Sequence, residues 1–376
     1  MKGSVPIMRV NYTYPQLFGS FFVSERSMKY RERLKEMIRI FFSVDDVLLT
    51  SSARCAIYMI VRSLPQKKVI VPAYTCEVVI EAVKLSGKEV IFASVSKETL
   101  NISEYPEIDS NTIVLATHQY GFPCEMTELA KECRVKGAVL IEDCAGSFGG
   151  RIDGKLTGTF GDYAVFSFSA SKTLHSPTKG GFIIARNKEL LDKVQPITDE
   201  PNDRFSFKMK QLVKSVGFCL AKNRLLSSWL FSRGHANSIH SELAYQTDSS
   251  YHRGLYEWQA YVLLFQFENV ETLLMERRTL FKQYYNSISN MLIERKTVKW
   301  GGVYIRYAIL VPDKERFVEY CRRNHVSVGI GYNHLYCPSE FSTAHEISRK
   351  IVYLPFGNGY TKEEIDKVIN VVNAFK

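Results

Sequence analysis

The chain has 376 residues, of which 45% are hydrophobic and 23% charged, and its formal net charge is +10. This length favours two domains, and the composition is ordinary for a globular protein. The positive charge favours anionic partners such as nucleotides, phosphates or membrane surfaces. No dense Lys/Arg tract is interleaved with aromatic residues, so the sequence does not indicate nucleic-acid binding.

The eight cysteines show neither a CxxC pair nor a metal-ligand spacing. We therefore predict free thiols in a reducing cytosol and no metal site. The N-terminus lacks the apolar segment of a signal peptide, and no apolar run is as long as a membrane span. These features predict a soluble, cytoplasmic protein.

The first two-thirds of the chain alternates predicted strands with predicted helices. Strands are expected at 46–50, 68–72, 90–92, 112–116, 138–142, 164–168 and 181–185. Helices are expected from a cap at Ser51-Ser52 to residue 61, and over 77–85 and 126–136. Short apolar strands separated by helices predict a mainly parallel sheet buried on both faces.

The last third has a different pattern. We predict one long helix over 257–288, a strand over 303–311, a helix over 314–324, and a final helix over 362–375 after a cap at Thr361. This pattern indicates a small α+β domain beside the large one. We therefore divide the chain into a large domain over 1–250, and a long helix with a small C-terminal domain over 251–376.

The stretch 205–233 mixes large apolar side chains with lysines and arginines. Such a stretch is typical of basic amphipathic helices. A helix pair that packs on the large domain or on a partner subunit is the favoured interpretation, because buried apolar faces usually have protein partners. A lid over the site and contact with a membrane surface are the alternatives.

Lys172 and Asp143 are the strongest candidates for chemistry. Asp143 follows the predicted strand 138–142, and Lys172 follows the strand 164–168. Ligands of parallel sheets gather at the carboxyl ends of strands, so the two side chains are expected to meet. A lysine and a carboxylate over one small ring suit pyridoxal phosphate (PLP), which needs a Schiff-base lysine and a carboxylate at its pyridinium nitrogen. On spacing alone, an ordinary strand-end Asp and a surface Lys remain the alternative.

Several ordered blocks resemble the DegT/StrS-type sugar aminotransferases, which are PLP enzymes of fold type I. These blocks are 71–75, 117–126, 141–145, 161–168 with its spacing to Lys172, and 257–260. Their order and separations are more specific than any single motif. The resemblance runs from about residue 45 to the C-terminus. It implies an α/β large domain with a mainly parallel, seven-stranded-type sheet flanked by helices, plus a small C-terminal α+β domain.

The resemblance also implies roles for individual residues. Lys172 would hold PLP and shuttle a proton, with its pKa lowered by burial, and Asp143 would pair with the pyridine nitrogen. The other implied cofactor contacts are Ser167, the helix start at Ala53 and Arg54, Cys76 beside the ring, and His252 reaching the phosphate of a partner subunit. For Arg54, an arginine that points to solvent is the alternative.

The chain also departs from the family pattern. Gly146, Cys76, Ser169 and Lys179 stand where the family usually has other residues. These departures leave the covalent and pyridinium anchors in place, but they leave open the substrate, the exact reaction and the affinity for the cofactor. His118 either touches cofactor or substrate, or braces the turn at 121–123, which is the favoured interpretation.

These features together predict a homodimeric PLP-dependent aminotransferase. Its expected substrates are a keto-sugar, nucleotide-linked in the favoured interpretation, and an amino-acid donor such as glutamate. One alternative is a dehydratase-like PLP enzyme, although related dehydratases carry His in place of the lysine. Another is a degenerate relative without catalysis. The sequence leaves open the sugar, the aminated carbon, the donor and the stereochemistry.

Overall fold

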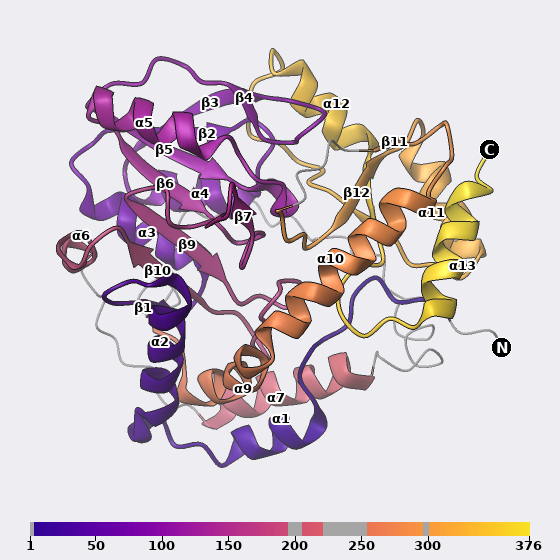
Figure 1. Cartoon of the computed structure of the whole chain (residues 1–376), viewed down its shortest axis with the longest axis horizontal. Coiled ribbons are helices and arrows are strands. Elements are labelled where there is room, and N and C mark those ends of the chain that lie inside the picture. The colour runs from indigo at the N-terminus through magenta and orange to yellow at the C-terminus, as the bar shows by residue number, and fades with distance from the viewer. Residues whose placement is uncertain (1–3, 195–204, 221–253, 296–300) are drawn as a thin grey trace.

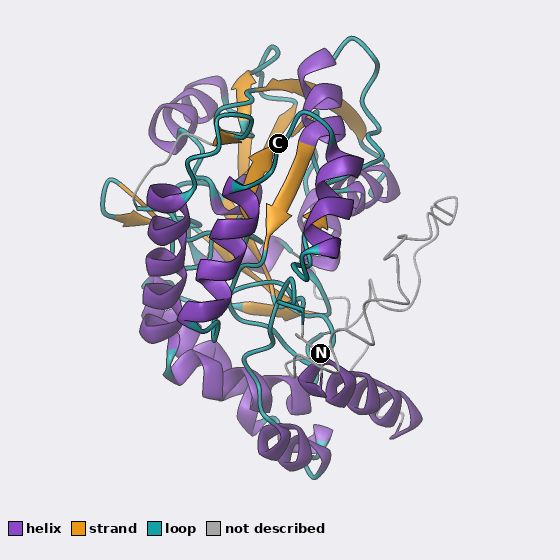
Figure 2. Cartoon of the chain, turned by 90° about the vertical axis from the view of Figure 1, so that its right-hand side faces the viewer, coloured by secondary structure: helices purple, strands orange, loops and turns teal. Residues whose placement is uncertain are grey.

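The computed structural model describes residues 4–194, 205–220, 254–295 and 301–376 (Figure 1). It contains an eight-stranded sheet and a separate four-stranded sheet. Helices lie on both sides of the strands (Figure 2). Helix α10 (Val270–Ser287) runs diagonally from the large α/β unit toward the smaller unit (Figure 1).

The large sheet has the strand order β1-β10-β9-β6-β5-β2-β3-β4. Its parallel strands are β2 (Lys68–Pro72), β3 (Glu89–Val95), β5 (Thr112–Thr117), β6 (Val139–Asp143) and β9 (Tyr163–Ser167). The antiparallel strands are β1 (Leu48–Thr50), β10 (Gly181–Ala185) and β4 (Ile102–Glu104). The sheet is therefore mainly parallel, and the predicted fold class is confirmed.

The helices of the large unit bury apolar faces against this sheet. Helices α3 (Ala53–Ser63) and α4 (Glu77–Leu85) share a core with it, and α5 (Met126–Lys136) packs in another core with β5 and β6. Helix α3 begins at Ala53 because the Ser52 side chain accepts a hydrogen bond from the Cys55 amide, as the sequence predicted. The remaining helices are α1 (Tyr14–Phe21), α2 (Lys29–Phe42) and α6 (Lys188–Lys193), with a short hairpin of β7 (Arg151–Ile152) and β8 (Lys155–Leu156).

The small unit is an antiparallel sheet covered by helices. Its strands run in the order β11 (Glu294–Arg295), β12 (Tyr307–Leu310), β14 (Ile351–Leu354) and β13 (Gly329–Ile330). Its helices are α11 (Lys314–Arg323), α12 (Ser342–Lys350) and α13 (Lys362–Asn373). The Thr361 side chain caps α13, as predicted. Val5 forms a parallel bridge with Val326, so the first described residues lie on the small unit.

Two elements of the last third differ from the predictions. The helix predicted over 257–288 is two helices, α9 (Glu257–Glu268) and α10, because Asn269 leaves helical geometry and its side-chain amide bonds the Phe265 carbonyl at 2.9 Å. The strand predicted over 303–311 is only β12. Its first half leaves the sheet because the Ile305 amide bonds the Tyr120 carbonyl of the large unit at 3.0 Å.

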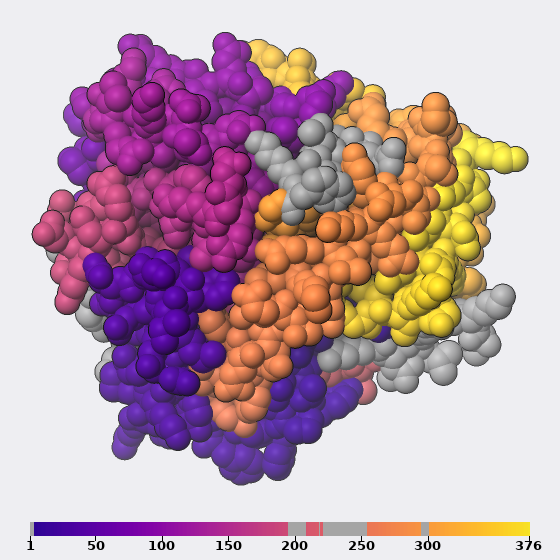
Figure 3. All heavy atoms as spheres, in the orientation of Figure 1, coloured from indigo at the N-terminus to yellow at the C-terminus, as the bar shows by residue number. Residues whose placement is uncertain are grey.

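Helix α7 (Phe205–Leu220) accounts for the first half of the amphipathic stretch and packs against α1. Residues 221–233, which completed the predicted helix pair, lie outside the described residues. Within the described part of the chain, every helix is too short or too polar to cross a membrane. In the space-filling view, the segment that holds α9 and α10 forms an orange band across one face, between α2 in indigo and the C-terminal residues in yellow (Figure 3).

Candidate active site

Asp143 lies at the carboxyl end of β6, buried at 5% exposure. Its neighbour across the parallel pair is Thr117, the last residue of β5. The Ala145 amide donates to Asp143 Oδ1 at 3.0 Å, and the Thr117 hydroxyl donates to Oδ2 at 3.5 Å. Burial raises the pKa of the Asp143 carboxyl, and the Ala145 amide and the Lys172 ammonium act in the opposite direction.

Lys172 lies in the loop after β9, within electrostatic reach of the Asp143 carboxylate. Burial lowers the pKa of Lys172, the charge of Asp143 raises it, and the cation of Arg306 lowers it. Cys76, at the start of α4, responds to the same two groups, since its pKa is raised by burial, lowered by Lys172 and raised by Asp143. Three of the residues named from the sequence therefore lie within electrostatic reach of one another.

Contacts from distant segments hold the Lys172 loop in place. The Lys172 carbonyl accepts hydrogen bonds from His175 Nδ1 at 3.0 Å and from Arg277 Nη2 at 3.2 Å. His175 Nε2 accepts from the Asn11 amide at 2.8 Å, so this bonding pattern places the imidazole proton on Nδ1. Gln266 bonds both the amide and the carbonyl of His175. The side chain of His175 thus supports the loop backbone.

A candidate anion-binding site lies where β9 and β10 meet the start of α3. Ser167 pairs with Gly181 across the two strands. A Cβ on Gly181 would lie 2.8 Å from the Ala53 amide nitrogen, so only glycine leaves room beside this amide. Among the described residues, the Ala53 N–H donates to no acceptor. A free amide at a helix N-terminus beside a serine hydroxyl fits a phosphate group.

The structure does not show the predicted phosphate contacts of Arg54 and His252. Arg54 forms an ion pair with the buried Glu81 of α4, at 3.0 Å, and its own side chain is 26% exposed. This pairing holds the guanidinium against α4. His252 lies outside the described residues, so its role in a neighbouring subunit stays a prediction.

His118 belongs to a buried network behind the site. Its Nδ1 accepts from the Cys124 amide at 3.0 Å, just after the 121–123 turn, and its Nε2 lies 3.3 Å from Glu142. Glu142 also accepts the amides of Gly158, Phe160 and Gly161, at 2.6 to 2.8 Å. His118 therefore braces the turn, which was the favoured interpretation.

The same network contains a group of side chains of the kinds that bind metals. Ligand atoms of His118, Glu142 and Cys144 lie within 4.8 Å of one another. However, both Glu142 oxygens and the free lone pair of His118 already accept hydrogen bonds from the chain. We therefore regard the group as structural.

The sequence did not single out the aromatic wall of the site. Tyr74 and Tyr120 share a hydroxyl hydrogen bond at 2.9 Å, and the Tyr332 amide donates to Tyr74 Oη at 3.2 Å. Tyr332 lies within electrostatic reach of Cys76 and Asp143, and burial raises its pKa. Tyr74 and Tyr120 lie inside recognised sequence blocks, but Tyr332 comes from the small unit and carries no local motif.

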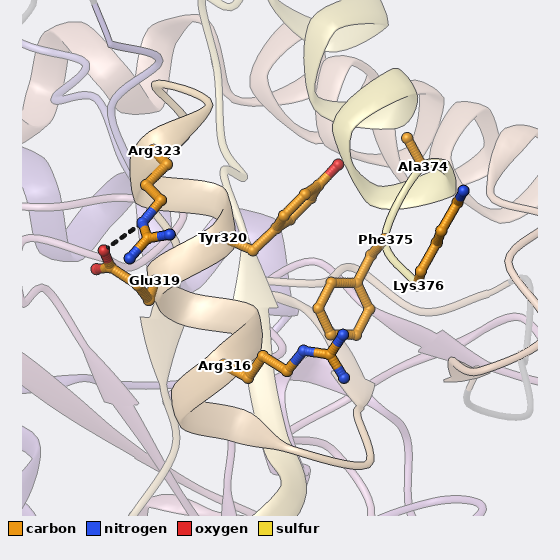
Figure 4. Close-up of a pocket in the computed structure, with 7 residues that line it drawn as sticks. All are labelled: Arg316, Glu319, Tyr320, Arg323, Ala374, Phe375 and Lys376. Carbon is orange, nitrogen blue, oxygen red and sulfur yellow. Dashed lines mark hydrogen bonds and ion pairs between the residues drawn. The ribbon is translucent and has the colours of Figure 1, made fainter.

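A hollow of about 360 Å³ lies elsewhere, on the small unit (Figure 4). Helix α11 and the last residues of the chain line it: Arg316, Glu319, Tyr320, Arg323, Ala374, Phe375 and Lys376. In Figure 4 Glu319 is paired with Arg323. No lining residue belongs to the group around Lys172, so this hollow is separate from the candidate site.

Comparison with known proteins gives one family. The model of the DegT/DnrJ/EryC1/StrS aminotransferase family matches residues 24–373. The GDP-perosamine synthase of Escherichia coli O157:H7 is 34% identical over 130 residues, which cover 34% of this chain and 35% of that protein. The GDP-perosamine synthase of Vibrio cholerae is 32% identical over 181 residues, 46% of this chain and 49% of that protein. The matched stretches thus span half or less of these relatives.

Solved structures extend the likeness to the whole fold. DesV of S. venezuelae superimposes with a TM-score of 0.75 at 18% identity, covering 99% of this chain and 98% of its own. The sugar aminotransferase Spr1654 of Streptococcus pneumoniae, described as putative and solved in its PMP form, has a TM-score of 0.73 at 15% identity, covering 98% and 97%. At these identities the likeness establishes the fold.

Proposed function

The chain belongs to the DegT/DnrJ/EryC1/StrS aminotransferase family, and we propose that it transfers the amino group of an amino acid, such as glutamate, to a nucleotide-linked keto-sugar. The membership makes it an aminotransferase of a PLP-dependent family. The donor, the nucleotide and the individual site residues are our proposal. The observation that carries it is the meeting of a buried carboxylate and a lysine, Asp143 and Lys172, at one edge of the sheet.

The described residues fit PLP. Lys172 would hold it covalently, Asp143 would face the ring nitrogen, and Ser167 with the α3 start at Ala53 and Arg54 would receive the phosphate. Cys76 would lie beside the ring, and His252 of the partner subunit would complete the phosphate site. When bound, PLP supplies an electron sink and carries the amino group between the two substrates.

The protein side chains manage the protons. Because burial lowers the pKa of Lys172, its neutral amine forms more readily than that of an exposed lysine, and this amine would take a proton from a substrate carbon and return it. Asp143 stays close to this cation and, fixed by the Ala145 amide, holds a proton on the ring nitrogen. Burial of the Asp143 carboxyl and partial burial of Lys172 limit the access of water to the proton transfer.

The nucleotide-linked substrate is supported by two further observations. The net charge of +10 attracts a diphosphate. The two GDP-perosamine synthases are named for a nucleotide-linked amino sugar. A homodimer remains part of the proposal, since His252 is expected to act across a two-fold interface.

The alternatives are weaker on this chain. A dehydratase-like reaction is disfavoured by the presence of Lys172 at the matched position. The departures at Gly146, Cys76 and His252 suggest a degenerate relative. A Cβ at Gly146 would lie 3.0 Å from the Gly121 amide nitrogen and 3.1 Å from the His118 carbonyl, so the backbone packs tightly here. The departure at Gly146 therefore has a structural reason that is independent of catalysis.

Absorption spectroscopy tests the proposal. The protein reconstituted with PLP should absorb in the visible range, and glutamate should bleach that band while 2-oxoglutarate accumulates. A nucleotide-linked keto-sugar should then restore the band. A colourless protein that ignores added PLP would instead support the degenerate relative. A coloured protein that no amino acid bleaches would contradict transamination.

A further inference from the structure

Arg306 enters the candidate site from the small unit. Its neighbour Ile305 donates its amide to the Tyr120 carbonyl at 3.0 Å, and Arg277 bonds the carbonyls of both Tyr304 and Lys172, at 3.4 and 3.2 Å. These bonds hold the segment before β12 against the Lys172 loop. Arg306 is therefore held near the Lys172 loop, within electrostatic reach of the lysine, although it is far from it in sequence.

The Arg306 side chain is half-buried and rests on an aromatic ring. Its guanidinium carbon lies 4.5 Å from the centre of the Tyr353 ring. Within the described part of the chain, its one side-chain hydrogen bond goes to the carbonyl of Ile305, at 3.3 Å. No carboxylate of the described residues lies within ion-pair distance of it. Stacking on Tyr353 fixes the guanidinium and leaves its other N–H groups able to bind a ligand.

The charges around Arg306 do not balance. The charge of Arg306 acts on the cations Lys172 and Arg277, and it lowers the pKa of the nearby Tyr120 and Tyr360. Asp143 acts on Lys172, and Glu276 acts on Arg277, but neither pairs with Arg306. An unpaired guanidinium close to other cations raises the electrostatic free energy of the site unless an anion binds there.

We propose that Arg306 binds the α-carboxylate of the amino-acid donor. This inference rests on the proposed function and adds a recognition site for one of its two substrates. The α-carboxylate is bonded to the same carbon as the amino group that reacts beside Lys172. A guanidinium next to Lys172 is thus placed for this carboxylate, and its planar fork matches two carboxylate oxygens.

The other anion available to the reaction is the diphosphate of the keto-sugar substrate. A sugar ring separates this diphosphate from the reacting carbon, so it must lie farther from Lys172 than the donor carboxylate does. The position of Arg306 beside the lysine therefore favours the donor.

Ligand binding to the PLP-loaded protein tests the inference without turnover. Glutarate, which keeps the carboxylates of glutamate but lacks its amine, and GDP, which carries the diphosphate, would each be titrated by calorimetry. In Arg306→Gln, the Kd of glutarate should rise by at least about thirtyfold, from the loss of charge-assisted hydrogen bonds. The Kd of GDP should change by less than about twofold, because nothing links Arg306 to the diphosphate.

Arg316 provides the matched control. It is an exposed arginine whose guanidinium lies 5.5 Å from the centre of the Phe375 ring, in the separate hollow of Figure 4. Arg316→Gln should leave both Kd values unchanged. Arg306→Lys, which keeps the charge without the fork, should give an intermediate Kd for glutarate. A near-native melting curve of Arg306→Gln would separate lost binding from lost folding, and Arg306→Lys serves if Gln fails to fold.

Three results would overturn the inference. These results are no binding of glutarate to the wild-type protein at millimolar concentration, normal binding of glutarate to Arg306→Gln, and loss of GDP binding in that variant instead. In steady-state kinetics, the supporting result is a raised KM for the donor with an unchanged KM for the keto-sugar. Failure of the proposed function is distinguishable, because there the wild-type protein itself would not react with any donor.

Discussion

Asp143 and Lys172 reach the same edge of the sheet in different ways. Asp143 is part of a strand, paired with β5 on one side and β9 on the other, and its carboxylate bonds to Ala145 two residues away. Lys172 lies in a loop, and its position depends on Asn11, Gln266 and Arg277, which are far from it in sequence. The carboxylate is thus placed by local structure, and the lysine is placed by tertiary structure.

This difference shows how the site can fail. A change near Asp143 should act on the carboxylate alone, because the strand remains paired on both sides. A substitution in a segment that is distant in sequence should displace the Lys172 loop although Lys172 itself is unchanged. The following variants test these two expectations, from the largest effect to the smallest.

Lys172→Ala should abolish the PLP adduct that borohydride reduces, because the covalent anchor is gone. The control is Lys179→Ala, which removes an exposed lysine of the same loop and should keep the adduct. Mass spectrometry of the reduced protein locates the modified residue. An adduct on Lys179 in the Lys172→Ala variant would show that the anchor is assigned to the wrong lysine.

Asp143→Asn should leave the fold intact and slow turnover by at least about tenfold, or about 1.4 kcal/mol of barrier. A neutral amide cannot hold a proton on the ring nitrogen. Asp153→Asn, in the exposed turn between β7 and β8, is the control, since Asn tolerates its left-handed backbone (φ 49°). Steady-state kinetics and circular dichroism measure the two effects. Turnover close to wild type would mean that Asp143 does not face the ring nitrogen.

Arg277→Met should destabilise the protein by about 2–4 kcal/mol and also displace the Lys172 loop. The variant leaves the Asn358, Tyr304 and Lys172 oxygens without their buried donor. Arg278→Met is the matched control, because Arg278 is half-buried and, among the residues that the structure describes, donates only to the Gly149 carbonyl. Urea unfolding gives the stability, and the rate of PLP adduct formation reports on the loop. Equal losses in the two variants would show that the buried network has no special role.

The pH dependence of PLP adduct formation should report the lowered pKa of Lys172. Only the neutral amine reacts, so the rate should rise with pH and level off below 10.5, the ordinary value for lysine. Arg306→Gln should move the midpoint to higher pH, because removing a nearby cation makes the ammonium less costly. Arg316→Gln should not move it. A midpoint at the ordinary value would indicate an exposed, unperturbed amine.

Much of the fold was predictable from local pattern. The bounds of β2, α4, α5 and β10 agree with the prediction, because continuous apolar strands and helix caps are local signals. The sequence did not predict the break at Asn269, because one asparagine only weakens a helical pattern. In the folded protein its side-chain amide donates a hydrogen bond to the Phe265 carbonyl. The late start of β12 was missed because the Tyr120 carbonyl, on the large unit, accepts the hydrogen bond of the Ile305 amide.

The sequence by itself determined which residues can do chemistry. The strand that ends at Asp143 and the motif before Lys172 identified both candidates, because strand ends are set by nearby apolar residues. Only the tertiary structure decided what surrounds them. Tyr332 and Arg306 come from the small unit and carry no local signal, and the support of Lys172 by Arg277 spans 105 positions. Such contacts depend on how two units pack, and side-chain chemistry along the chain does not encode that packing locally.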